Sequence, residues 1–377
     1  MGHWRGWLPR PGFLILLLYL TACTQATFNR PQGTIGPPHV TSRQSPADTP
    51  SLPSTSPGQT SAATSPPPPT NAPLTATHSP QTATSTPNPY APLTIAALAA
   101  RPYGGGELAI LDTLEETETY TRYLITYPSD GLTIYGFLSV PHEGSQFPVV
   151  IIAHGYIPSD EYEVEAYSTR YATALTEAGF MVIHPNLRNY PPSDSGPNPY
   201  RIGYAIDLLN LIAIVQDQSQ DPLGYLRRAD SNHIFLMGHS MGGNAVLRAI
   251  TVWPTAVQGA VLYGAMSGDE YRNYRLIRDW HGDAGAVFEL SAPAGMLPAI
   301  SPIYHLERIQ TPIAIHHSLD DEIVPPAWSE QLCQKLSDLG KSVECFTYDN
   351  TPHTFNGYAD TLFIERMIAF FAGILAR

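Results

Sequence analysis

The sequence has little lysine, little cysteine and no long apolar run, and each shortage excludes a class of protein or site. Lys335 and Lys341 are the only lysines, and 20 basic residues face 33 acidic ones, for a formal net charge of −13 at pH 7. Because a chain this acidic repels nucleic acid and anionic lipid heads, we expect neither as a partner. Two common metal-binding spacings, Cys-x-x-Cys and His-Glu-x-x-His, do not occur. We therefore expect no metal and no organic cofactor.

The N-terminal residues are typical of an export signal rather than of a membrane span. Their apolar run, residues 13–20, is much shorter than the roughly 20 residues that cross a bilayer. Arginines precede the run and Leu20-Thr21-Ala22-Cys23 ends it, as in a cleaved signal peptide. These four residues resemble the lipoprotein box of bacteria, which implies cleavage before Cys23 and lipid on its sulfur. We thus predict a signal peptide at 1–22 and a lipid-anchored, extracytoplasmic protein at the cell membrane; an ordinary secretory signal is the alternative.

Residues 23–100 have the composition of a disordered stalk. Proline, serine and threonine dominate, and Arg43 and Asp48 are the only charged residues between positions 31 and 100. Such a segment buries too little apolar surface to offset the entropy lost on ordering. The folded part is therefore predicted at 101–377, a length that suits one α/β catalytic domain.

Short apolar runs alternate with helical patterns along this domain. We predict strands at 121–128, 132–140, 147–153, 180–184, 234–237, 257–263, 312–316 and 343–348, and helices at 162–178, 202–215, 244–253, 326–339 and 362–375. Such alternation predicts a mostly parallel central sheet with helices on both faces, and functional groups at the carboxyl ends of its strands. The pattern breaks at about 266–302, where we expect an insertion over the active site; a surface helix pair far from the site is the alternative.

The most informative motif is Gly238-His239-Ser240-Met241-Gly242, which lies between an apolar run and a helical pattern. A strand, a tight turn and a helix in this order hold a serine with its hydroxyl exposed above the sheet. Glycines on both sides are needed where a side chain would collide with the neighbouring strand or helix. We therefore predict that Ser240 is a catalytic nucleophile.

A serine nucleophile needs a histidine base and a carboxylate that orients the base. In folds that hold a serine at such a strand, turn and helix, the three residues follow one another along the chain as serine, acid and histidine. His353 follows the last predicted strand and is the expected base. Asp320 and Asp321 follow the strand before it, and both are candidate acids. Asp349 suits the role less well because it precedes His353 on the same loop.

An oxyanion hole needs two N–H donors aimed at one point. The amide of Met241, directly after the nucleophile, is the first. The second is expected after the strand at 147–153, where we favour the Tyr156 amide, with Gly155 as the alternative. We interpret the preceding His154 as structural.

Together these residues resemble the α/β-hydrolase fold, over positions 120–376. More narrowly, the chain is similar to the catalytic domain of the prolyl oligopeptidase group of serine peptidases, through Ser129-Asp130-Gly131, His154-Gly155, the serine motif, Ser301-Pro302 and Ile309-Gln310-Thr311-Pro312. That group tends to show His-Gly-x-x-Asp-x-x-Val-Pro, which matches residues 317–325 with Ser318 in place of glycine. The match favours Asp321 over Asp320. Many such peptidases carry an N-terminal β-propeller, and this chain has only the stalk there.

The resemblance implies a serine hydrolase that cleaves an amide or ester bond of a small molecule or short peptide through an acyl-Ser240 intermediate. The first expectation is a peptidase like that group; a carboxylesterase is the alternative, followed by an acyltransferase or an inactive binding protein. An aminopeptidase needs a carboxylate for the substrate ammonium group, which Glu161, Glu163 or Glu165 would have to supply. Cys333 and Cys345 are expected either to form a disulfide or to remain two buried thiols. The sequence gives no oligomeric state.

Overall fold

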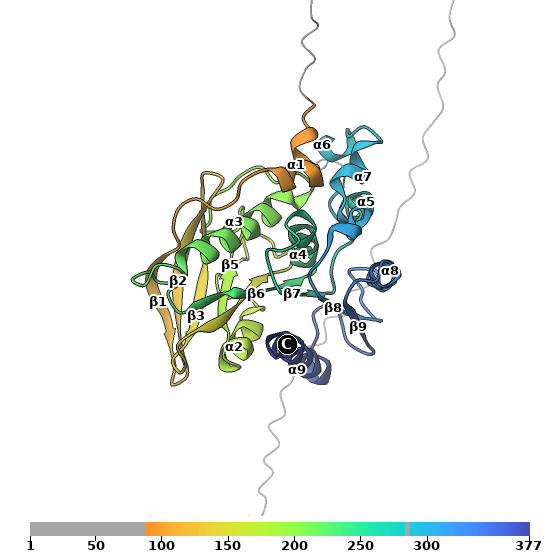
Figure 1. Cartoon of the computed structure of the whole chain (residues 1–377). Helices are drawn as coiled ribbons and strands as arrows, with labels where there is room; N and C mark the ends of the chain where they lie inside the picture. The colour runs from red at the N-terminus through yellow and green to blue at the C-terminus, as the bar shows by residue number, and fades with distance from the viewer. Residues whose placement is uncertain (1–87, 283–286) are drawn as a thin grey trace, which may run out of the picture. The chain divides into compact units, whose positions relative to one another are not determined.

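The computed structural model describes residues 88–282 and 287–377 (Figure 1). The predicted signal peptide at 1–22, the lipid on Cys23 and the stalk up to residue 87 lie outside the described residues, and so do residues 283–286 of the insertion. Within the two described ranges, no helix combines the length and the apolar character needed to cross a membrane.

The described residues form one nine-stranded sheet, in the order β1-β2-β3-β5-β4-β6-β7-β8-β9. The strands are β1 (Ala109–Glu116), β2 (Tyr120–Ser129), β3 (Leu132–Pro141), β4 (Phe147–Ala153), β5 (Met181–Pro185), β6 (Ala229–His239), β7 (Gly259–Tyr263), β8 (Ile313–Ser318) and β9 (Val343–Tyr348). The pairs from β1 to β5 are antiparallel, and those from β5 through β4 to β9 are parallel. This is the mostly parallel sheet of the α/β-hydrolase fold that the sequence predicts.

Helices cover both faces of the sheet. Figure 1 shows α3 (Ile202–Gln218) and α4 (Met241–Val252) on one side, and α2 (Thr169–Glu177) and α9 (Gly357–Leu375) on the other. Each side has its own apolar core, and the central strand β6 contributes to both. Ile234 and Leu236 pack into the core with α3 and α4, whereas Phe235 and Met237 pack into the core with α2 and α9. Burial on both faces explains why the central strands are continuous apolar runs.

One predicted helix begins later than the sequence indicates. The helix expected at 162–178 is α2, which starts only at Thr169. The preceding residues are held by side-chain contacts that a helix would break: the Tyr162 hydroxyl donates to Asn186, and the Ser168 hydroxyl bonds the ring of His184. Residues 162–168 therefore form turns between β4 and α2.

The predicted boundary between stalk and domain at residue 100 is wrong. Residues 91–100 form the 3-10 helix η1 (Ala91–Leu93) and α1 (Ile95–Ala100), and Ile95 and Leu98 are buried in the core with α4. The Thr94 side chain caps α1 by accepting from the Ala97 amide at 3.1 Å. This short stretch has few large apolar residues, so its two core contacts were not apparent in the sequence. The edge strand β1 was also missed, because most of its residues are exposed.

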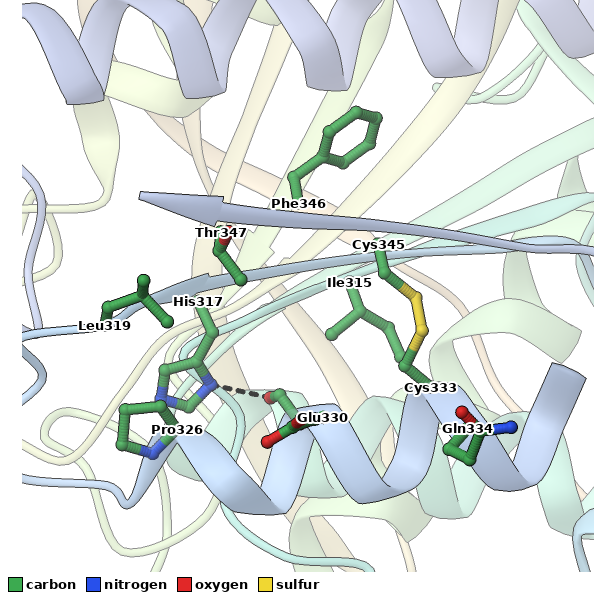
Figure 2. A pocket seen from close by; sticks show the side chains of 11 residues that line it. Ile315, His317, Leu319, Pro326, Glu330, Cys333, Gln334, Cys345, Phe346 and Thr347 are labelled. Atoms are coloured by element: carbon green, nitrogen blue, oxygen red, sulfur yellow. Dashed lines mark hydrogen bonds between the residues drawn. A yellow bond between two sulfur atoms is a disulfide. The ribbon is translucent and has the colours of Figure 1, made fainter. Parts of the chain in front are cut away.

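Helix α8 is joined to the edge of the sheet by a covalent link. Helix α8 (Pro326–Asp338) packs on β8 and β9, and a disulfide connects Cys333 of α8 with Cys345 of β9 (Figure 2). Of the two states that the sequence left open, the structure has the disulfide. It closes one side of a cavity of about 300 Å³ that His317 also lines.

Candidate active site

Ser240 lies at a sharp turn between β6 and α4. Its φ of 54° and ψ of −114° fall outside the regions that residues with side chains prefer. A Cβ on Gly242 would lie 2.1 Å from the Ala153 carbonyl oxygen, and one on Gly238 would lie 2.4 Å from the Gly242 carbonyl oxygen, so only glycine fits at either position. The Ser240 side chain makes no capping hydrogen bond to α4. The strand, turn and helix predicted around this serine are therefore present.

Asp321 and His353 are in direct contact. Oδ2 of Asp321 lies 2.6 Å from Nδ1 of His353 and 3.0 Å from Nε2 of His317. Its other oxygen accepts from the amides of Ile323 at 2.9 Å and Val324 at 2.8 Å. Burial alone would raise the pKa of Asp321, but the hydrogen bonds from His317 and His353 outweigh it and hold this pKa well below its usual range. The carboxylate is therefore ionised and holds the Nδ1 edge of the His353 ring.

The neighbouring acidic residues do not take this place. Asp320 is exposed, and its Oδ2 accepts from the Asn350 amide at 2.7 Å. Asp349 is exposed as well. The structure thus brings Asp321, rather than Asp320 or Asp349, to His353.

Ser240 and His353 open onto the same cavity, whose volume is about 400 Å³. Its lining consists of Gly155, Tyr156, Tyr167, His239, Ser240, Trp280, Ile323, His353 and Thr354. In the part of the chain that the structure describes, no hydrogen bond joins the Ser240 hydroxyl to the His353 ring. Such bonds are often long without substrate and shorten when it binds. Because Asp321 occupies Nδ1, Nε2 is the ring nitrogen that remains for the serine proton.

The two loops expected to form an oxyanion hole meet beside Ser240. Met241 begins α4, where the free N–H groups and the helix dipole favour negative charge. Tyr156 lies on the cavity and is 57% exposed. The Gly155 amide already donates to the Tyr167 hydroxyl at 2.9 Å. That bond makes Gly155, the alternative second donor, less suited to bind an oxyanion.

His154 is structural, as the sequence suggested. It is fully buried, with Nδ1 2.6 Å from the Gly155 carbonyl oxygen and Nε2 2.8 Å from that of Asn186. Burial lowers its pKa from the ordinary value. Its ring therefore braces the start of the oxyanion loop and does not open onto the cavity.

The insertion reaches the site through α5 (Glu270–His281), whose Trp280 lines the cavity. The shorter helices α6 (Val287–Leu290) and α7 (Met296–Ile300) follow it. None of the three acidic residues considered for binding a substrate ammonium group, Glu161, Glu163 and Glu165, is among the lining residues. Glu165 instead pairs with Arg122 at 2.8 Å. Within 88–282 and 287–377, no three His, Cys, Asp or Glu side chains are arranged to hold a metal ion.

Sequence reasoning missed three residues around the proposed triad. His317 bonds Asp321, and His239 bonds the carbonyl oxygen of His353. Tyr167 bonds His239 and the Gly155 amide. His317 carried a signal, since it is the first residue of the stretch that resembles His-Gly-x-x-Asp. Tyr167 carried none, because its partner His239 is 72 residues away along the chain.

The sequence model of the dienelactone hydrolase family matches residues 134–366. Among curated proteins, esterase YjfP of Escherichia coli (strain K12) is 26% identical over 215 residues, which cover 54% of this chain and 80% of the esterase.

Two solved structures share the fold at low identity. A puromycin-hydrolyzing peptidase of Mycobacterium tuberculosis is 21% identical, with a TM-score of 0.55, over 69% of this chain and 40% of the peptidase chain. Brefeldin A esterase, a bacterial protein, is 17% identical, with a TM-score of 0.54, over 71% of this chain and 80% of that one. Since both a peptidase and an esterase are similar, the narrower prediction of a peptidase stays a prediction.

Proposed function

The chain belongs to the dienelactone hydrolase family, and we propose that this serine hydrolase is a carboxylesterase that acts on small neutral esters through an acyl-Ser240 intermediate. The observation that carries the proposal is the Asp321–His353 pair, 2.6 Å apart, on the cavity where Ser240 lies at its strained turn. A carboxylate, an imidazole and a serine in this arrangement are what nucleophilic ester hydrolysis requires.

The chemistry follows from the atoms that remain available. Nε2 of His353 takes the Ser240 proton as Oγ attacks the ester carbonyl carbon. The amides of Met241 and Tyr156 donate to the resulting oxyanion. The His353 imidazolium, stabilised by Asp321, then protonates the leaving alcohol as the acyl-enzyme forms. In the second half, His353 takes a proton from water, the hydroxide attacks the acyl carbon, and Ser240 leaves with the proton returned to it.

The cavity lining supports an ester with an uncharged acyl group. Tyr156, Trp280 and Ile323 supply apolar surface, and the described lining residues include no lysine, arginine, aspartate or glutamate. A carboxylate-bearing substrate or the ammonium group of a peptide would find no opposite charge there. This is why we favour an esterase over an aminopeptidase. An acyltransferase shares the acyl-enzyme and would reveal itself by transferring the acyl group to added alcohols.

The experiment combines a covalent probe with two substrate classes. A fluorophosphonate probe should label the purified chain, and the Ser240→Ala variant should lose both labelling and hydrolysis of p-nitrophenyl butyrate. Aminoacyl p-nitroanilides should be cleaved at least a hundredfold more slowly, measured as kcat/KM. Labelling that persists in Ser240→Ala would remove this serine from the role, and efficient cleavage of the anilides would replace the esterase by a peptidase.

The proposal also places the enzyme outside the cytoplasmic membrane, held by lipid on Cys23. The support is the sequence Leu20-Thr21-Ala22-Cys23 after a short apolar run. Labelled fatty acid should be incorporated into the full chain expressed in bacteria, and Cys23→Ala should abolish it. Equal labelling of both forms would contradict the anchor.

A further inference from the structure

A continuous hydrogen-bonded chain runs behind Ser240 and connects the two loops on either side of it. The Gly155 amide lies 2.9 Å from the Tyr167 hydroxyl, which bonds Nδ1 of His239. On the other side of that ring, Nε2 lies 3.3 Å from the carbonyl oxygen of His353. Gly155 is next to the proposed oxyanion donor Tyr156, and His353 is the proposed base. The proposed mechanism does not use Tyr167 or His239.

The donor and the acceptor of each hydrogen bond in this network can be assigned. A carbonyl oxygen only accepts, so Nε2 of His239 carries the hydrogen that points to His353. Burial, together with the nearby His353, lowers the pKa of His239 well below its ordinary value, so the ring is neutral. Nδ1 is then an acceptor, and the Tyr167 hydroxyl donates to it. Since that proton is committed to His239, Tyr167 accepts from Gly155 and is not itself a donor to the oxyanion.

Packing confines the groups of this hydrogen-bonded network. The His239 ring stacks on Tyr263 at 4.2 Å between centroids and lies 4.7 Å from the His353 ring. A Cβ on Gly155 would lie 2.8 Å from the Tyr167 hydroxyl oxygen and 3.0 Å from Nδ1 of His239. Any side chain at position 155 would therefore displace the two groups that join the loops.

We propose that Tyr167 and His239 form a positioning relay, which sets the oxyanion loop and the loop of the catalytic histidine at a fixed separation around Ser240. The inference rests on the proposed function, because it assigns these residues a task in the Ser240 reaction. Both rings border the cavity, but the protons of the Tyr167 hydroxyl and of His239 Nε2 are committed within the relay. The relay aligns the Tyr156 amide and the His353 base, which act on the transition state, so its loss lowers kcat and leaves KM nearly unchanged.

The test compares two tyrosines of the same segment. Tyr167→Phe removes the relay hydroxyl and keeps the ring, whereas Tyr162→Phe removes a hydroxyl that bonds Asn186 at 3.1 Å and has no part in the relay. With p-nitrophenyl butyrate, Tyr167→Phe should lower kcat roughly 10- to 100-fold with KM within about twofold, less than the 10²–10³-fold cost of deleting an oxyanion donor outright. Tyr162→Phe should stay within about threefold in kcat. Rates are expressed per site titrated with the fluorophosphonate, so that unfolded protein is not counted.

A double variant tests the connection itself. Because the relay acts as one unit, adding His239→Phe to Tyr167→Phe should lower kcat by less than the product of the two single effects. Equal kcat for Tyr167→Phe and Tyr162→Phe, a rise in KM with kcat unchanged, or strictly multiplicative effects in the double variant would overturn the relay. These outcomes are distinct from failure of the proposed function, in which the wild-type chain itself would show no Ser240-dependent hydrolysis.

Discussion

Nε2 of His317 lies 3.0 Å from Oδ2 of Asp321, the same oxygen that contacts His353 at 2.6 Å. The proposed triad acid is thus held between two imidazoles. His317 is itself anchored by the Ser329 hydroxyl, 2.6 Å from Nδ1, in the first turn of α8. Its Nε2 also lies 3.0 Å from the Val324 carbonyl oxygen. The Asp321 loop therefore depends on α8 for its position as well as on β8.

His317→Phe should lower kcat/KM for a p-nitrophenyl ester by roughly tenfold or more, because a hydrogen bond to a charged group contributes about 1.5–3 kcal/mol. Ser329→Ala is the matched control, since it removes the far partner of His317 and leaves the bond to Asp321 in place. Its effect should be several times smaller, measured in the same assay at pH 8. An unchanged kcat/KM in His317→Phe would mean that His353 and the backbone amides alone hold Asp321.

The two adjacent aspartates provide a sharper comparison. Asp321→Asn should lower kcat by roughly 10⁴-fold, because the amide keeps the shape but holds the imidazole in the wrong tautomer. Asp320→Asn should stay within about threefold, because Asp320 is exposed and its carboxylate accepts from the Asn350 amide rather than from His353. Steady-state kinetics on the ester substrate check both. A large loss in Asp320→Asn with a small one in Asp321→Asn would reverse the assignment.

The elements and site residues that could be predicted from the sequence are those at which local pattern and tertiary structure agree. Both faces of β6 are buried, so its apolar run could be read directly, and the turn at Ser240 is a local motif. The choice between Asp320 and Asp321 needed a family resemblance, because adjacent residues of one loop differ only in which of them turns inward. The late start of α2 could not be predicted, since contacts with distant residues such as Asn186 override the local preference for helix.

Buried histidines make stability depend on pH in a predictable direction. His316 is fully buried among Phe346, Phe363 and Tyr348, and burial, with a smaller effect of Arg366, lowers its pKa to about 3. Between its ordinary pKa of about 6.5 and about 3, the unfolded chain binds a proton that the native chain does not. The free energy of unfolding therefore falls as pH falls through this window, by up to about 1.4 kcal/mol per pH unit for this one group.

Replacing His316 by phenylalanine tests that linkage. The free energy of unfolding in urea is measured from pH 8 to pH 4 for the wild-type chain and for His316→Phe. Plotted against pH, the two curves should be parallel above pH 7. Below pH 6 the slope should be smaller in the variant, by the contribution of about one proton. His184, whose pKa burial also lowers to about 3, should maintain part of the slope in both proteins. Identical slopes over the whole range would show that His316 does not titrate on unfolding.

Glu270 connects the insertion to the helix that carries the nucleophile, and it should be among the costliest residues to replace. It is fully buried at the start of α5, 2.6 Å from Arg201 and paired with Arg248 of α4. Burial would raise its pKa, but the two arginines outweigh this effect and lower it, so Glu270 is charged. Glu270→Gln removes the carboxylate that pairs with Arg248 and leaves Arg201 only its longer contact with Glu289, at 3.8 Å. It should destabilise the fold by about 3–5 kcal/mol.

The same substitution should also affect the active site. Helix α5 carries Trp280, which lines the cavity, so a displaced helix should raise KM for esters with long acyl chains more than for acetate. Asp279→Asn is the control, because this carboxylate of the same helix is largely exposed and should contribute no more than about 1 kcal/mol. Urea unfolding and KM for p-nitrophenyl acetate and octanoate measure the two effects. If Glu270→Gln unfolded like Asp279→Asn and kept its preference among acyl chains, the arginine–glutamate cluster would not be what holds the insertion over Ser240.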